Sequence, residues 1–240
     1  MHNESRLLFG TRGFFVKILI KAFLRHCIVY PFILLNYRLT ICGLDETLGK
    51  TDSAIVVVNH TSFMDAPLLV SIVWPIQLRG VVWYEEYARP YFRPFFKLFD
   101  AFSVGSSNKL PKRVRLRCKE KSMQLMIEAL ASGQHVALSP EGGINDGTGV
   151  KIAPHFSGLH DLIRAHPTKP LVLVTMEGLQ CSVFGRAKNK CFHWKRLPVT
   201  VTFQTIENVS LEGGPAGLNR RVEQFYNDGI PLTTVGKQSV

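Results

Sequence analysis

The sequence predicts an α/β fold with a largely parallel sheet flanked by helices and preceded by an N-terminal amphipathic helical segment. Two observations carry this prediction. Beyond Leu39, short apolar or β-branched runs alternate with segments whose apolar residues recur at helical spacing, a pattern typical of parallel strands covered by helices. The chain has 240 residues, of which 46% are hydrophobic, so it can build one complete core without a second domain.

Three segments are expected along the chain. Residues 1–40 form a membrane-associating amphipathic helical segment, residues 41–230 form the α/β domain, and residues 231–240 form a frayed tail. No internal repeat or low-complexity linker separates them in the sequence, and the glycine-rich stretch 143–149 is the most loop-like part of the domain. One domain with an N-terminal appendage is therefore the predicted organisation.

The N-terminal stretch 14–35 is rich in Phe, Ile and Leu but carries Lys17, Lys21 and Arg25. Because these cations stand at i, i+4 and i+8, they share one face of a helix while the rest is apolar. The pattern predicts a helix that lies in a membrane interface, with its cations attracted to an anionic bilayer. The charges and Pro31 interrupt any run long enough to span a membrane. The alternative is a helix packed on the core with its lysines outward.

Six short runs are expected to be strands because they are apolar or β-branched. In chain order they are Ala54–Val58, Gly80–Trp83, Ala101–Val104, His135–Leu138, Leu171–Thr175 and Val199–Phe203. Helical spacing of apolar residues predicts helices at Val114–Ala131, which stops before Gly133, and at Phe156–Ala165, which stops ahead of Pro167. Strands and helices thus alternate through the domain.

Residues 59–65 follow the first predicted strand and place a histidine, His60, five residues before a carboxylate, Asp65. A neutral imidazole acts as a general base when one ring nitrogen is open and a carboxylate accepts a hydrogen bond from the other. Five residues span about one and a half helical turns, so the two side chains meet only if the first residues stay in a turn. The alternative is a surface histidine and an aspartate that stabilises a helix start.

A second motif, residues 139–143, follows the predicted strand at 135–138 and contains Glu141, Gly142 and Gly143. By itself a Glu-Gly-Gly sequence is most often only a turn. Both motifs nevertheless follow strands, and ligands of open α/β sheets bind at the carboxyl ends of the strands. The main-chain N–H groups of Gly142 and Gly143 are candidates for stabilising an oxyanion, because glycine lets the backbone approach a ligand closely.

Together the two motifs resemble those of the glycerolipid acyltransferase family, which includes 1-acylglycerol-3-phosphate and lysophospholipid acyltransferases. That family has a His-x4-Asp block followed by a Pro-Glu-Gly block, and this chain carries both in that order and at a similar separation within residues 50–180. The resemblance implies that His60 deprotonates an acceptor hydroxyl and that Asp65 orients His60. It also implies that the block from Glu141 to Gly143 helps hold the acceptor.

The chain departs from this family at three places. Gly143 and Ile144 follow the Glu-Gly pair where the family has Thr and often Arg. The stretch 102–107 lacks the arginine that the family uses for the acceptor's phosphate, and the nearest cations are Lys109, Lys112 and Arg113. The family's late Val-Pro-Val block is matched only loosely, at residues 170–174. Acyl transfer is therefore expected more firmly than a phosphorylated acceptor, and one of the three cations is expected to replace the arginine.

The net charge of +11 and the pI of about 9.6 call for an acidic partner, which anionic lipid, acidic substrates and nucleic acid all satisfy. The densest basic cluster lies at residues 109–121 and indicates either a solvated helix face or a surface that meets phosphate or membrane. No aromatic residues are interleaved with it as stacking platforms, and no nucleic-acid motif is recognisable in the sequence. Nucleic acid is therefore not an expected partner.

The cysteines and histidines argue against disulfides and metals. Five cysteines are scattered without a Cys-x-x-Cys spacing, so a reducing compartment is the simpler interpretation. Of the histidines, only His155 and His160 stand at a near-helical spacing, and no matching set of carboxylates accompanies them. No metal site and no bound cofactor are expected.

These observations predict an O-acyltransferase on the cytoplasmic side of a membrane, with the anionic membrane surface as a partner. It moves a fatty acyl group from acyl-coenzyme A or acyl carrier protein to a hydroxyl of a lysolipid or glycerol-phosphate-like acceptor, in phospholipid biosynthesis or remodelling. The alternatives are a non-catalytic membrane-binding protein of the same fold and a hydrolase in which His60 activates water. The sequence has no Gly-x-Ser-x-Gly elbow, which favours direct attack over a covalent acyl-enzyme.

Overall fold

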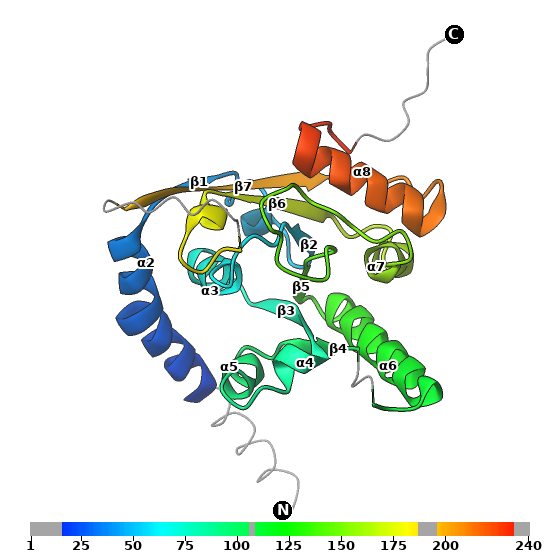
Figure 1. The fold of residues 1–240 in the computed structure, drawn as a ribbon, viewed down its shortest axis with the longest axis horizontal. Coiled ribbons are helices and arrows are strands. Elements are labelled where there is room, and N and C mark those ends of the chain that lie inside the picture. The colour runs from blue at the N-terminus through cyan, green and yellow to red at the C-terminus, as the bar shows by residue number, and fades with distance from the viewer. Residues whose placement is uncertain (1–15, 106–108, 187–195, 233–240) are drawn as a thin grey trace, which may run out of the picture.

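The computed structural model describes residues 16–105, 109–186 and 196–232 and contains a seven-stranded sheet (Figure 1). The expectations for residues 1–15 of the helical segment and for 233–240 of the tail lie outside the described residues. The strands are β1 (Tyr37–Cys42), β2 (Ile55–Val58), β3 (Leu78–Trp83), β4 (Phe102–Val104), β5 (His135–Leu138), β6 (Leu171–Glu177) and β7 (Leu197–Ile206). Their order across the sheet is β1-β7-β6-β2-β5-β3-β4.

Most of the sheet is parallel. Strands β6, β2, β5, β3 and β4 all run in one direction. Strand β7 runs antiparallel to β6, and β1 pairs in parallel with β7, so these two strands oppose the other five. The predicted fold, a largely parallel sheet flanked by helices and preceded by a helical segment, is confirmed.

Strand β1 is not among the six predicted strands. It follows directly on the N-terminal helix, and its burial is low, because Tyr37 is buried whereas the next five residues are half-buried or exposed. A mostly exposed edge strand has no continuous apolar run in its sequence, which is why the sequence does not predict β1. The helical segment consequently ends at Asn36, and the strand starts three residues before the segment boundary predicted at residue 40.

The helices that cover the sheet, with the short helices of its loops, are α3 (Asp65–Ile72), α4 (Tyr84–Tyr87), α5 (Arg93–Leu98), α6 (Lys112–Ala131), α7 (Gly158–Ala165), α8 (Gly214–Asp228), η2 (Leu48–Lys50) and η3 (Leu179–Cys181). Helices α6 and α7 agree with the two predicted in the domain. Two glycines in the left-handed region stand at the start of helix α8: Gly213 caps it and Gly214 is its first residue. The helix ends before a third, Gly229, which is a common way for a helix to stop.

Each face of the sheet carries its own hydrophobic core, because successive side chains of a strand point to opposite sides. In β2, Val56 and Val58 pack in the core that includes α3 and the N-terminal helix. Ile55 and Val57 pack in the core that includes α6, α7 and α8. All four side chains are buried. A strand covered on both faces gives a continuous apolar run in the sequence, which is why β2 is predictable.

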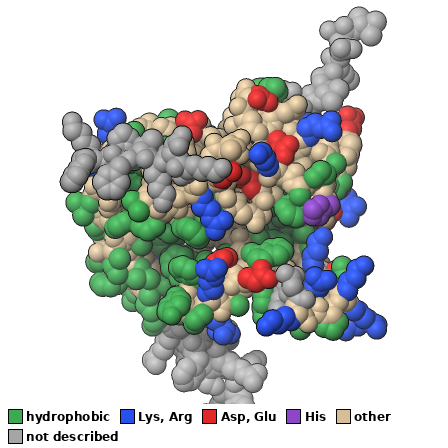
Figure 2. Space-filling model, in the orientation of Figure 1, with side chains coloured by type: hydrophobic (Ala, Val, Ile, Leu, Met, Phe, Trp, Pro, Cys, Tyr) green, Lys and Arg blue, Asp and Glu red, His purple; other side chains and the backbone are tan. Residues whose placement is uncertain are grey.

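The N-terminal helix spans Val16–Asn36; its middle, η1 (Leu24–Val29), is a π-helix and its last part is α2 (Tyr30–Asn36). By length and composition it is apolar enough to cross a membrane, with a mean hydropathy of 1.8. Only 6% of its most apolar stretch is buried within the molecule. Hydrophobic side chains gather on the side of the molecule where this helix lies (Figures 1 and 2).

The cations of this helix form contacts with the domain. Lys17 Nζ and Lys21 Nζ lie 2.9 and 3.4 Å from the carboxylate oxygens of Asp100. The Arg25 Nε donates a 2.8 Å hydrogen bond to the main-chain oxygen of Ser71. The expectation that these three cations meet an anionic bilayer is therefore wrong. Helical spacing shows that they share a face, and that face is the one that attaches the helix to α3 and to the end of α5.

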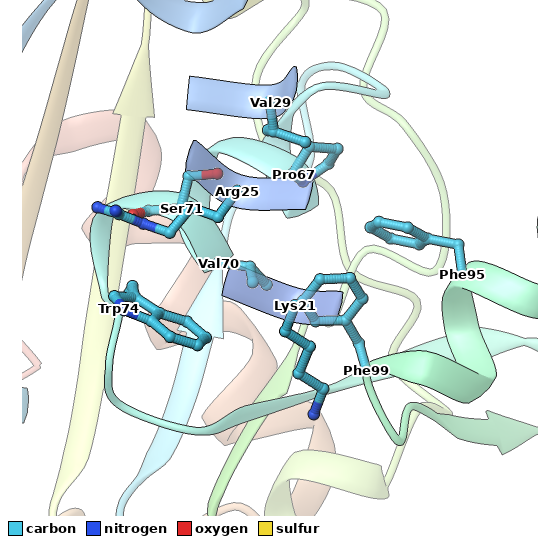
Figure 3. A pocket seen from close by; sticks show the side chains of 9 residues that line it. All are labelled: Lys21, Arg25, Val29, Pro67, Val70, Ser71, Trp74, Phe95 and Phe99. Atoms are coloured by element: carbon cyan, nitrogen blue, oxygen red, sulfur yellow. The ribbon is translucent and has the colours of Figure 1, made fainter. Parts of the chain in front are cut away.

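A small hollow lies where the helix meets α3 and α5 (Figure 3). Lys21, Arg25, Trp74 and Phe99 are among the residues that line it. It has room for about one water molecule. The contact between the helix and the domain is therefore close, and Lys21 Nζ lies 5.6 Å from the centre of the Phe99 ring.

The ion pairs of Asp100 predict how the helix responds to acid. Burial raises the pKa of Asp100, but the hydrogen bond from Lys17 and the charges of Lys21 and Lys17 outweigh it, so the pKa lies below its ordinary value. A lowered pKa means that this contribution to stability is present above the ordinary aspartate pKa and is lost as the pH falls through the lowered pKa.

We expect Asp100→Asn to loosen the helix and leave the domain folded. Asn tolerates the left-handed backbone of this position, where φ is 53°. Because part-exposed ion pairs contribute at most about 1 kcal/mol, hydrogen exchange across residues 16–25 should become about fivefold faster. Asp228→Asn on α8 is the control. Unchanged exchange in the Asp100 variant would show that apolar contacts alone hold the helix.

Candidate active site

The two sequence motifs meet at one edge of the sheet. Strands β2 and β5 are neighbours in parallel register, with Val57 opposite Leu138, so they end side by side. His60 follows β2 after one residue and Glu141 follows β5 after two. Both side chains therefore lie at the carboxyl ends of the parallel strands, where ligands of this fold class bind.

His60 and Asp65 form the predicted pair. The Nδ1 atom of His60 lies 2.9 Å from Oδ2 of Asp65. This oxygen also accepts hydrogen bonds from the main-chain N–H groups of Thr61 (2.6 Å) and Ser62 (3.0 Å). Because Oδ2 of Asp65 accepts hydrogen bonds from two N–H groups, it also accepts one from the imidazole. The proton of the neutral ring is therefore on Nδ1, and Nε2 has the free lone pair.

The turn between the two residues makes this geometry possible. Helix α3 does not begin until Asp65, so residues 61–64 stay in a turn, which is the condition that the five-residue spacing requires. The Asp65 side chain is 5% exposed and the His60 side chain is 32% exposed. A buried carboxylate thus holds a ring whose other edge remains open to a substrate.

Glu141 contacts the main chain of the histidine. Its Oε1 accepts a 2.6 Å hydrogen bond from the N–H of His60. Its Oε2 accepts a 3.1 Å hydrogen bond from the side-chain amide of Asn145. The main-chain N–H of Asn145 donates a second hydrogen bond, of 2.6 Å, to the main-chain oxygen of His60. His60 is therefore held at both of its main-chain polar groups by the loop that follows β5.

The environment of Glu141 raises the pKa of its carboxyl group. Burial raises the pKa of Glu141, and the hydrogen bonds from His60 and Asn145 offset part of this effect. The nearby charge of Asp65 adds to the rise. Glu141 therefore retains its proton to a higher pH than an ordinary glutamate does.

The two glycines of the turn differ in their surroundings. Gly142 has a φ of +72°, and a Cβ there would lie 2.8 Å from the ring of Phe156, so both the backbone and the neighbour require glycine. Its N–H points back toward the carbonyl oxygen of Ser139 at 3.5 Å. Gly143 is exposed, and a Cβ there would have no neighbour within 4 Å. Of the two predicted oxyanion donors, Gly143 is thus the one beside open space.

Three further polar residues support the site. The side chain of Asn59 exchanges two hydrogen bonds with the main chain of Met176 at 2.9 and 2.7 Å, which joins the end of β2 to β6. The hydroxyl of Tyr226, on α8, donates to the carbonyl oxygen of Val57 at 2.8 Å. Burial, with the charge of Glu141, holds the pKa of this hydroxyl well above its usual range. Asn145 completes the set through its contacts with His60 and Glu141.

The sequence points to two of these three residues and gives no indication of the third. Asn59 and Asn145 lie within or beside the motifs, and an amide next to a catalytic-type side chain is a recognisable candidate for a supporting role. Tyr226 has no such signal, because it lies 169 residues from Val57 on a helix that sequence spacing did not reveal.

The segment after β6 packs against the histidine loop. Ser62 and Gly185 form an antiparallel bridge, and the N–H of Phe63 donates to the carbonyl oxygen of Phe184 over 3.2 Å. The buried hydroxyl oxygens of Ser62 and Ser182 lie 3.3 Å apart. Ser62 therefore shapes the turn and joins two loops, as its hydroxyl also accepts from the N–H of Met64.

The cations expected to replace the family's phosphate-binding arginine lie elsewhere on this edge. Lys109, Lys112 and Arg113 follow β4 and are exposed. Strand β4 is three places from β2 in the sheet order, which is about 14 Å at the usual strand spacing. Two strands, β5 and β3, therefore stand between the strand that precedes these cations and the strand that precedes His60. No group of three or more His, Cys, Asp or Glu side chains suited to a metal occurs among the residues that the structure describes.

A histidine with a carboxylate partner and a second acidic loop, at the carboxyl edge of a mostly parallel sheet, defines an α/β enzyme of the acyl-transfer type. The model of the family named Acyltransferase matches residues 41–177, which is more than half of the chain, so this protein belongs to that family. The family resemblance read from the two motifs is thereby confirmed.

The comparisons with individual proteins bear on the fold. No curated protein matches the chain. The crystal structure of the 1-acyl-sn-glycerophosphate (LPA) acyltransferase PlsC from Thermotoga maritima is similar, with a TM-score of 0.58 and 18% sequence identity. The match covers 91% of this chain and 87% of that one. At this identity the similarity establishes a common fold over most of both chains.

The raised pKa of Glu141 predicts a pH-dependent effect of Glu141→Gln. Because the folded pKa lies above the unfolded one, the wild-type protein loses stability relative to the variant as the pH rises from the ordinary glutamate value through the raised value. The difference in free energy of unfolding between wild type and Glu141→Gln should become constant at pH values above the raised pKa. Urea unfolding at a series of pH values measures it, with Glu207→Gln at an exposed position as control. A difference that stays constant or changes with the opposite sign would contradict this account.

Proposed function

We propose that this protein is a membrane-associated O-acyltransferase that moves a fatty acyl group from an acyl thioester to a hydroxyl of a lysolipid or glycerol-phosphate-like acceptor. The donor is acyl-coenzyme A or acyl carrier protein, and no cofactor is bound. The observation that carries the proposal is the 2.9 Å contact between His60 Nδ1 and the buried Asp65 carboxylate, in a chain of the Acyltransferase family. It leaves Nε2 of His60 as a base at the edge where substrates bind.

The proposed reaction begins with proton transfer from the acceptor hydroxyl to Nε2 of His60. The hydroxyl oxygen attacks the thioester carbonyl carbon, and a C–O bond forms. As the tetrahedral intermediate collapses, the C–S bond breaks and the departing thiolate takes the proton from the imidazolium. Asp65 stabilises that imidazolium between the two proton transfers, and general base catalysis of this kind is worth about 10² to 10⁴ in rate.

Glu141 and the glycine turn have separate roles in this proposal. Glu141 fixes the main chain of His60, because both carboxylate oxygens are engaged in the loop contacts. The N–H of Gly143 beside open space is the proposed donor to the oxyanion of the tetrahedral intermediate. Binding of the acceptor by the Glu-Gly block then takes place through the backbone rather than through the Glu141 carboxylate.

Membrane association is proposed to occur through the apolar side of the N-terminal helix, on the cytoplasmic face of the bilayer. Leu19 and Phe23 are 68% and 59% exposed, and the cations of the helix are turned toward the domain. Burial of apolar side chains therefore supplies most of the attraction, and anionic lipid contributes through other basic surfaces of the protein.

Substitution of the catalytic pair tests the reaction. His60→Ala should remove acyl transfer and leave the fold intact, because the ring is part-exposed at a strand end. Asp65→Asn should lower kcat about 10²-fold or more, with little change in acceptor binding, since an amide cannot accept all three hydrogen bonds and stabilise imidazolium.

Mass spectrometry of lipids after incubation with mixed lysolipids and labelled acyl thioesters measures these effects. His155→Ala is the control for a generic histidine. Retained transfer by folded His60→Ala would refute the mechanism. Release of free fatty acid without acylated lipid would identify a hydrolase, and no turnover of any thioester would favour a non-catalytic membrane-binding protein.

Changes in the helix test the membrane proposal. Leu19→Ser with Phe23→Ser should release the protein from vesicles, because each lost apolar side chain costs about 1.5–3 kcal/mol, or at least about tenfold in partitioning. Replacing Lys17, Lys21 and Arg25 by Gln should leave binding to anionic vesicles nearly unchanged, because these cations are engaged by the domain. Cosedimentation measures both, with Ile230→Ser as the control. Full binding by the serine variant, or binding that depends on these cations and on low salt, would contradict the proposal.

A further inference from the structure

An exposed segment connects the two short helices that follow β3. It covers residues 88–94, from the end of α4 to the first turn of α5, and every residue in it is exposed. Tyr91 and Phe92 stand at its centre, between arginine–proline pairs at residues 89–90 and 93–94. Tyr91 is 88% exposed and Phe92 is 43% exposed. Large aromatic side chains placed this way contribute little to the core of the protein and indicate an interaction surface.

Stacked rings and prolines hold this Tyr91 segment in place. The rings of Phe92 and Phe96 lie 6.2 Å apart. Tyr87, on α4, stacks against Phe96 at 5.8 Å with an interplanar angle of 15°. The two prolines restrict the backbone further, because the proline ring fixes φ. The segment therefore presents its exposed side chains from a defined base, and little conformational entropy is lost when they bind.

The Tyr91 segment adjoins the exposed apolar surface of the N-terminal helix. Lys17 and Lys21 of that helix pair with Asp100, two residues after the end of α5. In Figure 1, α4 and α5 lie beside the start of the helix. Leu19 and Phe23, on the same part of the helix, are exposed as well. Two elements with exposed apolar side chains are thus neighbours on the surface.

The same segment starts from the edge of the sheet that carries the candidate active site. Strand β3 runs parallel to β5 and β2, so Trp83 at its carboxyl end lies at the edge where His60 follows β2. The two strands are two places apart in the sheet, which is about 10 Å at the usual spacing. Trp83 and Tyr84 are also exposed. Aromatic side chains therefore stand both at the catalytic edge and in the segment beyond α4.

The composition of this surface fits the boundary between lipid and water. Tyrosine and tryptophan are enriched there because an apolar ring carries a polar group at its end. Arginine adds paired hydrogen bonds to lipid phosphates. Arg89 already pairs with Glu86 at 2.9 Å, so Arg93 is the cation of the segment that we assign to lipid. A bilayer already in contact with the neighbouring helix is the partner that satisfies both kinds of side chain.

We propose that the Tyr91 segment is a second membrane contact, which places Tyr91 and Phe92 in the head-group layer of a phospholipid bilayer and Arg93 at its phosphates. The N-terminal helix alone would leave the domain free to rotate about the helix axis. Because a line and a point beside it define a plane, the segment stops that rotation and keeps the edge that carries His60 at the bilayer. This inference rests on the proposed membrane-associated function and names a further surface for it.

Fluorescence quenching tests where the segment lies. Tyr91→Trp adds a tryptophan and keeps an aromatic ring at this position. On vesicles whose lipids carry bromine near the head group, the emission that this tryptophan adds should be quenched. Leu125→Trp, at an exposed apolar position of α6, is the matched control and should keep its added emission. Unquenched emission from vesicle-bound Tyr91→Trp would overturn the proposal and make a protein partner the better occupant.

Partitioning into vesicles tests the separate side chains. Tyr91→Ser with Phe92→Ser should lower partitioning into neutral and anionic vesicles about tenfold or more. Arg93→Gln should lower it about fivefold on anionic vesicles only, and high salt should remove that difference. Leu125→Ser and Arg113→Gln, both on α6, are the controls. Partitioning of the serine variant equal to that of wild type would refute the contact, and an equal effect of Arg113→Gln would refute the assignment to Arg93.

Activity separates this inference from the proposed function. With a short-chain acceptor and thioester dissolved in water, the serine variant should match wild type, and circular dichroism should show that it is folded. With a long-chain acceptor in vesicles, its rate should fall about tenfold or more, as its partitioning does. Wild-type protein without transfer on either substrate overturns the function itself. Equal vesicle rates in active wild type and variant overturn only the second contact, as does an equal loss on the dissolved substrate.

Discussion

The hydrogen bond from the main-chain N–H of His60 to the carboxylate of Glu141 is the contact on which the site depends. It joins the loops after two neighbouring parallel strands, and the N–H of Asn145 completes the join at the carbonyl oxygen of the same residue. Because the backbone of His60 is held on both sides, the contact with Asp65 can fix the orientation of the imidazole ring. A hydrogen bond to a charged group is worth about 1.5–3 kcal/mol, and here part of that gain offsets the cost of burying Glu141.

Much of this arrangement is predictable because local patterns determine it. Strands β2 and β5 are apolar runs, and the strand-end position of His60 and Glu141 follows from those runs and from the rule that parallel strands end at one edge. Contacts between distant residues leave no local pattern. Asp100 meets Lys17 across 83 residues, so helical spacing places the cations on one face without revealing what that face touches. Edge strand β1 is likewise mostly exposed and gives no apolar run.

The N-terminal helix and the catalytic edge are parts of one surface. Phe32 of α2 contacts the segment after β6, and that segment pairs with the residues directly after His60. In the proposed membrane association, the orientation of the helix on the domain sets where a bilayer approaches this edge of the sheet. Asp100 and Ser71 hold the helix through its cationic side, which leaves apolar side chains such as Leu19 and Phe23 exposed.

Tyr226 has a consequence for the order in which the protein forms during synthesis. Its hydroxyl bonds to the end of β2 across 169 residues, and Asn59 bonds to β6 across 117. Contacts of such long range form late, because the chain between them must be closed first. The loop that carries His60 therefore gains its last supports only after α8 has left the ribosome. A nascent or C-terminally truncated chain that lacks α8 therefore lacks the Tyr226 hydrogen bond at the end of β2, the strand that leads to His60.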